Sequence, residues 1–204
     1  MNFILKLWLY LAFAMAGAIG CYLWEHRNTI CVSKLLTGLM LITLPFHMFE
    51  ERIYPGGFHY IYGMIFGMTQ TQLVMLSCNV TVLLFYTWLF VKKGDEPCVA
   101  VMSCLFGSLE FVMHLYEGIV SLRTFPEMGL PYSPGFVVTL VMMLPVSVYG
   151  ATQLTKQKLL TPKTVLKGFA LMIFIAITMV LLPNIIFNNS AYPFPNNGLY
   201  DAFL

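Results

Sequence analysis

Charged residues are scarce in this sequence. Lys, Arg, Asp and Glu together make up only 10% of its 204 residues, whereas soluble proteins carry roughly a quarter. The mean hydropathy is +0.79. Such a composition excludes an ordinary water-soluble domain and predicts an integral membrane protein. We therefore expect membrane lipids as partners, and no nucleic acid.

Paired cysteine motifs are also missing. The five cysteines stand at positions 21, 31, 78, 98 and 104, and these positions show no spacing typical of a disulfide framework or a zinc finger. All except Cys31 lie within or at the edge of a hydrophobic run. We expect them to pack as small apolar side chains.

Long hydrophobic runs are what the sequence has in abundance. Six of them lie near residues 5–24, 35–54, 71–91, 97–121, 135–153 and 169–187. Each is close to the ~20 residues that a helix needs to cross the hydrocarbon core. The connections are too short to hold a soluble domain. The sequence thus predicts an all-α polytopic membrane protein, in which residues 1–204 form a single bundle of six transmembrane helices.

Basic residues are divided unequally between the two ends of the predicted bundle. One end holds eight, namely Arg27, Lys34, Lys92, Lys93, Lys156, Lys158, Lys163 and Lys167, and the other holds Lys6, Arg52 and Arg123. Basic residues concentrate on the cytoplasmic side of a membrane. We therefore predict that both termini and the loops 55–70 and 122–134 are extracytoplasmic in a cell membrane. This orientation requires the first run to be retained as a span.

The few charges that do lie near apolar runs are clustered. In "FHMFEERIYPGGF", His47, Glu50 and Glu51 are spaced i, i+3, i+4 and share one face of a helix. The run from Leu35 to Phe49 is too short to span, so the helix is expected to continue to about residue 54. Carboxylates inside a membrane span are costly and normally turn inward to a partner.

The fourth run supplies a counterpart. In "LEFVMHLYEG", Glu110, His114 and Glu117 again share one face. At 1.5 Å per residue, His47 and His114 both lie ~10 Å below the outer surface, and Asn79 of the third run lies within about a turn of that level. The pattern predicts one polar site, shared by three helices, in the outer leaflet.

The stretch "HMFEE" resembles the HXXEE family of bacterial integral membrane proteins, which is named for this motif. His47, Glu50 and Glu51 match the motif, and the resemblance includes "ERIYPGGF" and the later "EFVMH". It extends over about residues 35–155 and leaves the first and last spans outside. The resemblance implies a site at these residues without implying a particular reaction.

A histidine and a carboxylate one turn apart on each of two helices are typical of metal sites in helical bundles. We predict His47, Glu51, Glu110 and His114 as ligands of a divalent metal, and Glu50 as a general base. Imidazole and carboxylate ligands serve both zinc and iron. Zinc would suit hydrolysis and iron a redox step, so the first hypothesis is a metal-dependent membrane enzyme.

Three further residues are candidates for contact with a lipid-like or isoprenoid-like substrate: Asn79, Glu117 and His59. Each has a plainer interpretation. Asn79 could form a hydrogen bond between helices, Glu117 lies nearer the surface, and His59 stands among aromatic residues of the kind that anchor a helix end at the membrane interface. A lid over the site is the alternative role for His59.

Other functions remain open from sequence alone. A metal-free isomerase or cyclase could use buried carboxylates as proton donors and acceptors. A small proton-coupled transporter would also need buried acids, although the acids lie in only one half of the bundle and no inverted repeat is evident. A structural or partner-binding membrane subunit is the last alternative.

Overall fold

A computed structural model describes residues 2–67, 71–187 and 192–204, with side chains from residue 7 onward except at position 179. These residues form helices and contain no strand. The elements are α1 (Asn2–Glu25), α2 (Val32–Arg52), α3 (Phe58–Phe66), α4 (Gln72–Lys93), α5 (Pro97–Thr124), η1 (Pro126–Met128), α6 (Phe136–Val138), η2 (Thr139–Met143), α7 (Leu144–Lys156), α8 (Pro162–Ile175), η3 (Ala176–Leu181), α9 (Leu182–Phe187) and η4 (Gly198–Ala202).

Six helices among the described residues are long and apolar enough to cross a membrane. They are Leu7–Glu25, Val32–Arg52, Gln72–Lys93, Pro97–Thr124, Phe136–Lys156 and Pro162–Phe187. The prediction of an all-α polytopic bundle with six spans is confirmed. The last span begins at Pro162, seven residues before the predicted start, because Thr161 and Pro162 begin the helix as N-cap and first residue.

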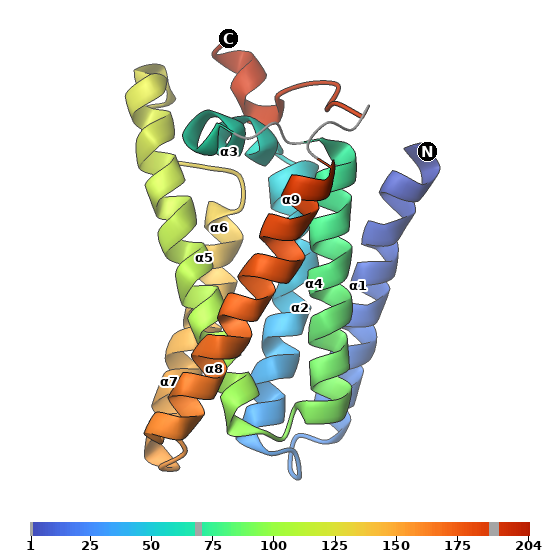
Figure 1. Ribbon diagram of the computed structural model, residues 1–204, viewed down its shortest axis with the longest axis vertical. Helices are drawn as coiled ribbons and strands as arrows, with labels where there is room; N and C mark the ends of the chain where they lie inside the picture. Colours follow the sequence, from blue (N-terminus) through green and yellow to red (C-terminus); the bar gives the residue numbers. More distant parts are fainter. Residues whose placement is uncertain (1, 68–70, 188–191) are drawn as a thin grey trace.

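The predicted loop 55–70 contains a helix, which the sequence analysis missed. α3 is nine residues long, too short to span a membrane, and residues in left-handed conformation, Gly57 and Gly67, bound it at φ +101° and +64°. It lies across the end of the bundle at which both chain ends are found (Figure 1). The three connections that follow α1, α4 and α7 lie at the opposite end (Figure 1), where the eight basic residues listed above gather.

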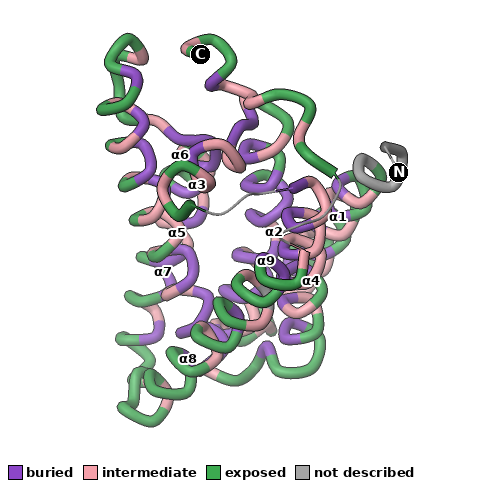
Figure 2. The backbone as a smooth tube through the Cα atoms, turned by 45° about the horizontal axis from the view of Figure 1, so that its top comes forward, coloured by how far each residue is buried: buried purple, intermediate pink, exposed green. Residues whose placement is uncertain are grey.

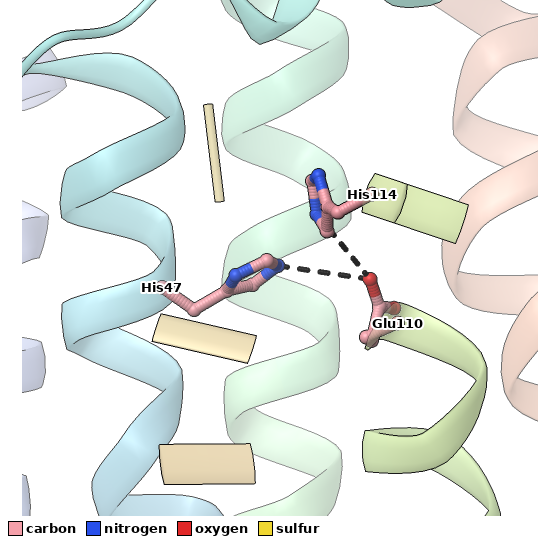
Figure 3. A group of neighbouring side chains, drawn as sticks. All are labelled: His47, Glu110 and His114. Carbon is pink, nitrogen blue, oxygen red and sulfur yellow. Dashed lines mark ion pairs between the residues drawn. The ribbon is translucent and has the colours of Figure 1, made fainter. Parts of the chain in front are cut away.

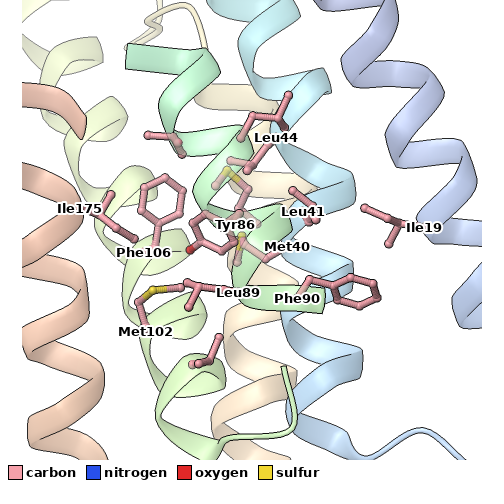
Figure 4. Close-up of a cluster of buried hydrophobic side chains, with 14 of the residues drawn as sticks. Ile19, Met40, Leu41, Leu44, Tyr86, Leu89, Phe90, Met102, Phe106 and Ile175 are labelled. Atoms are coloured by element: carbon pink, nitrogen blue, oxygen red, sulfur yellow. The ribbon is translucent and has the colours of Figure 1, made fainter. Parts of the chain in front are cut away.

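α2 is the central helix. In its most apolar stretch of 18 residues, 61% are buried inside the bundle, against 18% in the corresponding stretch of the last span. Burial is concentrated toward the centre of the molecule (Figure 2). The main core joins side chains of α1, α2, α4, α5 and α8 (Figure 4), among them Ile19, Met40, Leu41, Leu44, Tyr86, Leu89, Phe90, Met102, Phe106 and Ile175. A Cβ atom at Gly107 would lie 2.5 Å from Oγ of Ser147 and 3.0 Å from the backbone oxygen of Met143. A small residue is therefore favoured where α5 approaches η2 and α7.

Two spans contain a widened, π-helical turn before a proline. η2 precedes Pro145 and η3 precedes Pro183, as expected where a proline ring crowds the carbonyl four residues earlier. The last span crosses the bundle obliquely: α8 packs against α5, whereas α9 packs against α4 (Figure 1). The upper halves of α5 and the last span therefore diverge.

α3 is held in place by the C-terminal segment. Ile61 of α3 packs against Phe125 and Tyr200, and His59 stacks on Phe194 with ring centroids 3.8 Å apart and an interplanar angle of 10°. Burial lowers the pKa of His59 to about 4. A hydrogen bond with the backbone of residue 196 raises the pKa again, but only in part. His59 Nε2 has no hydrogen-bond partner among the described residues.

We predict that acid loosens this contact. The folded-state pKa of His59, about 4, is below the ordinary value of about 6.5. Between pH 4 and pH 6.5 the folded protein therefore binds fewer protons than the unfolded protein. Its stabilising contribution is complete above about pH 6.5 and is lost as the pH falls toward 4. Hydrogen exchange of residues 192–204 should therefore be faster at pH 5 than at pH 7 after correction for intrinsic rates. His59→Gln should remove this difference, and an equal difference in the variant would contradict the prediction.

Candidate metal centre

Two neighbouring helices carry the four side chains that the sequence assigned to a metal. His47 and Glu51 project from α2, and Glu110 and His114 project from α5. Figure 3 shows His47, Glu110 and His114 pointing toward one another. The two histidines are 5% and 1% exposed, and their rings meet edge to face with centroids 5.0 Å apart. The structure thus brings the two predicted halves of the site together.

Both carboxylates lie near both imidazoles. The Nε2 atom of His47 is 3.3 Å from Glu51 Oε1 and 3.7 Å from Glu110 Oε2. The Nε2 atom of His114 is 3.5 Å from Glu51 Oε1 and 3.8 Å from Glu110 Oε2. One ligand atom each from His47, Glu110 and His114 lies within 4.8 Å of the other two, so this group could hold a metal ion.

The hydrogen-bond partners of His114 assign its tautomer. Ser133 donates its hydroxyl proton to the carbonyl oxygen of His114 at 2.9 Å. The same hydroxyl oxygen, 3.2 Å from Nδ1 of His114, is left to accept a proton from that nitrogen. Glu117 Oε2 also lies 3.0 Å from Nδ1, though not in hydrogen-bond geometry. Nδ1 therefore carries a ring proton, and in the neutral ring the lone pair of Nε2 faces Glu51 and Glu110.

The segment before the fifth span closes one side of the group. Gly135 has φ +103°, and a Cβ atom built there would overlap Cε1 of His114 and lie 2.9 Å from Cε1 of His47. Only glycine lets the backbone lie directly against both imidazoles in this conformation. Helix α3 covers another side of the group. The centroid of its Phe58 ring is 5.5 Å from that of the His114 ring.

Glu50 occupies a different position from the one expected for a base beside the metal. Its Oε1 accepts hydrogen bonds from the Tyr132 hydroxyl at 2.8 Å and the Val137 backbone N–H at 3.0 Å, and its Oε2 accepts one from Val138 N–H at 2.8 Å. The carboxylate thus caps the N-terminus of α6, where a negative charge is stabilised. Glu50 holds the Gly135 segment in place, and its predicted catalytic role stays a prediction without geometric support.

A cavity of about 280 Å³ lies beside the group, between α2, α3, α4, α5 and the last span. His47, Glu51, Glu110 and His114 line it, together with Phe and Met side chains. Three of its lining residues, Phe66, Leu109 and Ala176, are exposed on the outside of the bundle. The cavity therefore reaches the lateral surface where α5 and the last span diverge.

The three residues predicted to contact a substrate have different positions. Asn79 and Glu117 line the cavity, whereas His59 is not among its lining residues. Asn79 also joins two helices: with its oxygen turned toward Arg52, it accepts hydrogen bonds from Nε at 2.9 Å and from Nη2 at 3.1 Å. Glu117, which is 1% exposed, contacts His114 from the far side of its ring.

Sequence reasoning missed Ser133 and Gly135 as parts of the site. The only local signal was the turn-forming "PYSPG" before the fifth run. Their contacts with His114 span 19 and 21 residues of chain, and no helical periodicity links such distant positions.

Comparison with protein-family models, curated proteins and solved structures finds no match for this chain.

Proposed function

We propose that this protein is a zinc-dependent membrane hydrolase that acts on a lipid-like substrate. The observation that carries the proposal is the spacing of the donor atoms. The four distances between imidazole nitrogens and carboxylate oxygens are 3.3–3.8 Å, longer than charge-assisted hydrogen bonds of about 2.7–2.9 Å. Donor atoms around a tetrahedral ion with bonds of about 2.0–2.1 Å lie about 3.3–3.4 Å apart, so an ion fits this group better than direct hydrogen bonds do.

Charge supports the same conclusion. With Nε2 of His114 unprotonated, its lone pair faces the oxygens of Glu51 and Glu110, and no lysine or arginine forms an ion pair with either carboxylate among the described side chains. Such an arrangement inside a membrane span is unfavourable without a positive charge between the donors. A divalent cation supplies that charge and, when bound, activates water or polarises a carbonyl group.

Glu117 and Ser133 lie beside the ring nitrogen of His114 that faces away from the proposed ion. A metal-binding histidine commonly donates its other ring N–H to a carboxylate or another acceptor, which orients the ring and increases the basicity of the ligand nitrogen. Here Ser133 Oγ is the acceptor, 3.2 Å from Nδ1, and the Glu117 carboxylate lies 3.0 Å from the same nitrogen, where its charge favours the protonated Nδ1. We therefore assign Glu117 to orientation of His114 in place of direct substrate contact.

Four donors are one more than the three protein ligands typical of a hydrolytic zinc site. Both carboxylates line the cavity, but the Glu51 side chain is 8% exposed and lies closer to both imidazoles, whereas the Glu110 side chain is 26% exposed. We assign Glu51, His47 and His114 to the ion and Glu110 to proton transfer with the substrate. Glu110 thereby takes the role that the sequence suggested for Glu50.

The cavity supports an apolar substrate that enters from the membrane. Its walls are mostly hydrophobic, and its mouth lies on the lipid-facing side of the bundle between α5 and the last span. The basic residues at the opposite end support an extracytoplasmic position for the site. A lipid with a hydrolysable ester or amide could insert its chain laterally and present that bond to Glu110.

The test compares zinc-loaded wild type with Glu110→Gln and Glu51→Gln in lipid nanodiscs, using a panel of acyl esters and amides. We expect the wild type to release fatty acid and to stop when zinc is chelated. Glu110→Gln should retain most of its zinc but hydrolyse at least about 100-fold more slowly, the usual effect of losing an acid–base group. Glu51→Gln should lose zinc.

Turnover that persists after complete removal of metal, and that still requires Glu110, would replace this proposal with the metal-free acid–base enzyme. Equal rates for Glu110→Gln and wild type at equal zinc content would reject the assignment of Glu110.

A further inference from the structure

A second hollow lies on the other side of α2, outside the metal group. This headgroup groove has a volume of about 910 Å³ and lies between α1, the end of α2 and the C-terminal segment. Its lining includes Arg52 and Asp201, together with the aromatic side chains of Trp8, Tyr10, Phe13 and Phe194. A groove at a helix end among aromatic residues is typical of the level of lipid headgroups.

Arg52 forms no ion pair in the part of the chain that the structure describes, although the charge of the adjacent Glu51 acts on it. Its guanidinium lies 5.2 Å from the centroid of the Trp8 ring, and Asn79 accepts from two of its N–H groups. The ion pairs among the described residues use His47, Lys93 and His114 as their cationic groups, and none includes Arg52. An arginine has five N–H donors in a rigid fork suited to phosphate, so several remain for a ligand.

The groove also has a negative group of its own. Asp201 accepts hydrogen bonds from the backbone N–H and the side-chain amide of Asn197 at 3.0–3.1 Å, which hold its carboxylate on the groove wall. Asp201 forms no ion pair with Arg52 in the described structure. Arg52 and Asp201 both line the groove without pairing with each other, and such a groove is complementary to a ligand that carries both charges.

We propose that this groove binds the headgroup of a zwitterionic membrane phospholipid. Arg52 holds the phosphate with its free N–H donors, and Asp201 and the neighbouring aromatic rings receive the ammonium group, which is attracted to both a carboxylate and an aromatic face. The acyl chains extend along the exposed side of α1, where Tyr10 and Leu11 are 72% and 62% exposed. This binding site is separate from the proposed hydrolytic centre and does not depend on it.

The experiment is native mass spectrometry of delipidated protein in detergent, titrated with phosphatidylethanolamine, phosphatidylglycerol or inorganic phosphate. We expect wild type to prefer phosphatidylethanolamine. Arg52→Gln should reduce affinity for both lipids by at least about tenfold, as expected when a charge-assisted hydrogen bond to phosphate is lost. Asp201→Asn should abolish the preference for phosphatidylethanolamine while leaving phosphatidylglycerol bound.

Arg123→Gln is the matched control, because Arg123 is an exposed basic residue near the end of α5. It should bind lipid as wild type does. Arg52→Lys keeps the charge, and we expect intermediate affinity from it; should Arg52→Gln fail to fold, unchanged affinity in the folded Arg52→Lys variant would count against the phosphate contact. Equal losses in Arg52→Gln and Arg123→Gln, equal binding of the two lipids by wild type, or competition by inorganic phosphate at lipid concentrations would overturn the proposal.

Discussion

His114→Ala is expected to lose most of the metal that the wild type binds. Wild-type protein loaded with zinc and passed through a desalting column should retain about one equivalent per chain, as a site of this donor set would. Removal of a direct ligand should reduce zinc affinity by more than the 10–100-fold that loss of an outer contact typically costs. His114 Nε2 lies within 3.8 Å of both carboxylates. Removing the imidazole therefore takes one donor atom from the group and leaves the ion with fewer ligands. Elemental analysis measures the result.

His26→Ala is the control for that experiment. His26 lies at the opposite end of the bundle, where its Nδ1 contacts the carbonyl oxygen of Tyr22 at 2.9 Å, and its loss should leave zinc content unchanged. The helices are long and apolar enough to insert without metal, so His114→Ala should elute as a monodisperse protein in detergent. A wild type with well under one equivalent of zinc, iron or manganese after reconstitution would remove the basis of the metal centre.

Gly135→Ala is the second substitution for which we expect a large effect. The new Cβ would overlap the His114 ring and lie 2.6 Å from its Nε2, so the imidazoles or the backbone must shift and the donor atoms lose their present spacing. The positive φ of +103° adds backbone strain of about 1–3 kcal/mol for a residue other than glycine. We expect a lower unfolding temperature in detergent together with a loss of zinc comparable to that of His114→Ala.

Gly129→Ala separates the two causes. Gly129 also has a positive φ, +72°, but a Cβ atom there meets nothing within 4 Å. It should therefore show a similar backbone penalty while keeping its zinc. Full zinc retention by Gly135→Ala, or equal zinc loss in both variants, would contradict the close contact between the Gly135 backbone and the two histidines.

Helical spans were predictable because they depend on local composition. A run of about 20 apolar residues in a membrane must satisfy its backbone hydrogen bonds internally, and a helix does so without any partner. The same reasoning holds for the faces of α2 and α5: spacing alone put His47 with Glu51, and Glu110 with His114, one turn apart. Their inward orientation follows from the cost of exposing such groups to lipid.

The short helix α3 was not predictable in the same way. Its nine residues are too few to span, and an aromatic loop has a similar composition. Its helical form depends on packing against Phe125 and Tyr200, residues that are more than 50 positions distant in sequence.

By itself, then, the sequence determined that this is a six-span helical bundle and that its polar residues form matched pairs on two helices, since both properties arise within single helices. Only the tertiary structure decided which of the two adjacent carboxylates joins the histidines and which caps a helix. Glu50 and Glu51 are neighbours with identical side chains, yet successive residues of a helix point about 100° apart, so Glu51 meets the histidines while Glu50 caps α6. The tautomer of His114 and the need for glycine at 135 likewise depend on which distant segment packs against the ring, and that choice is made by the bundle as a whole.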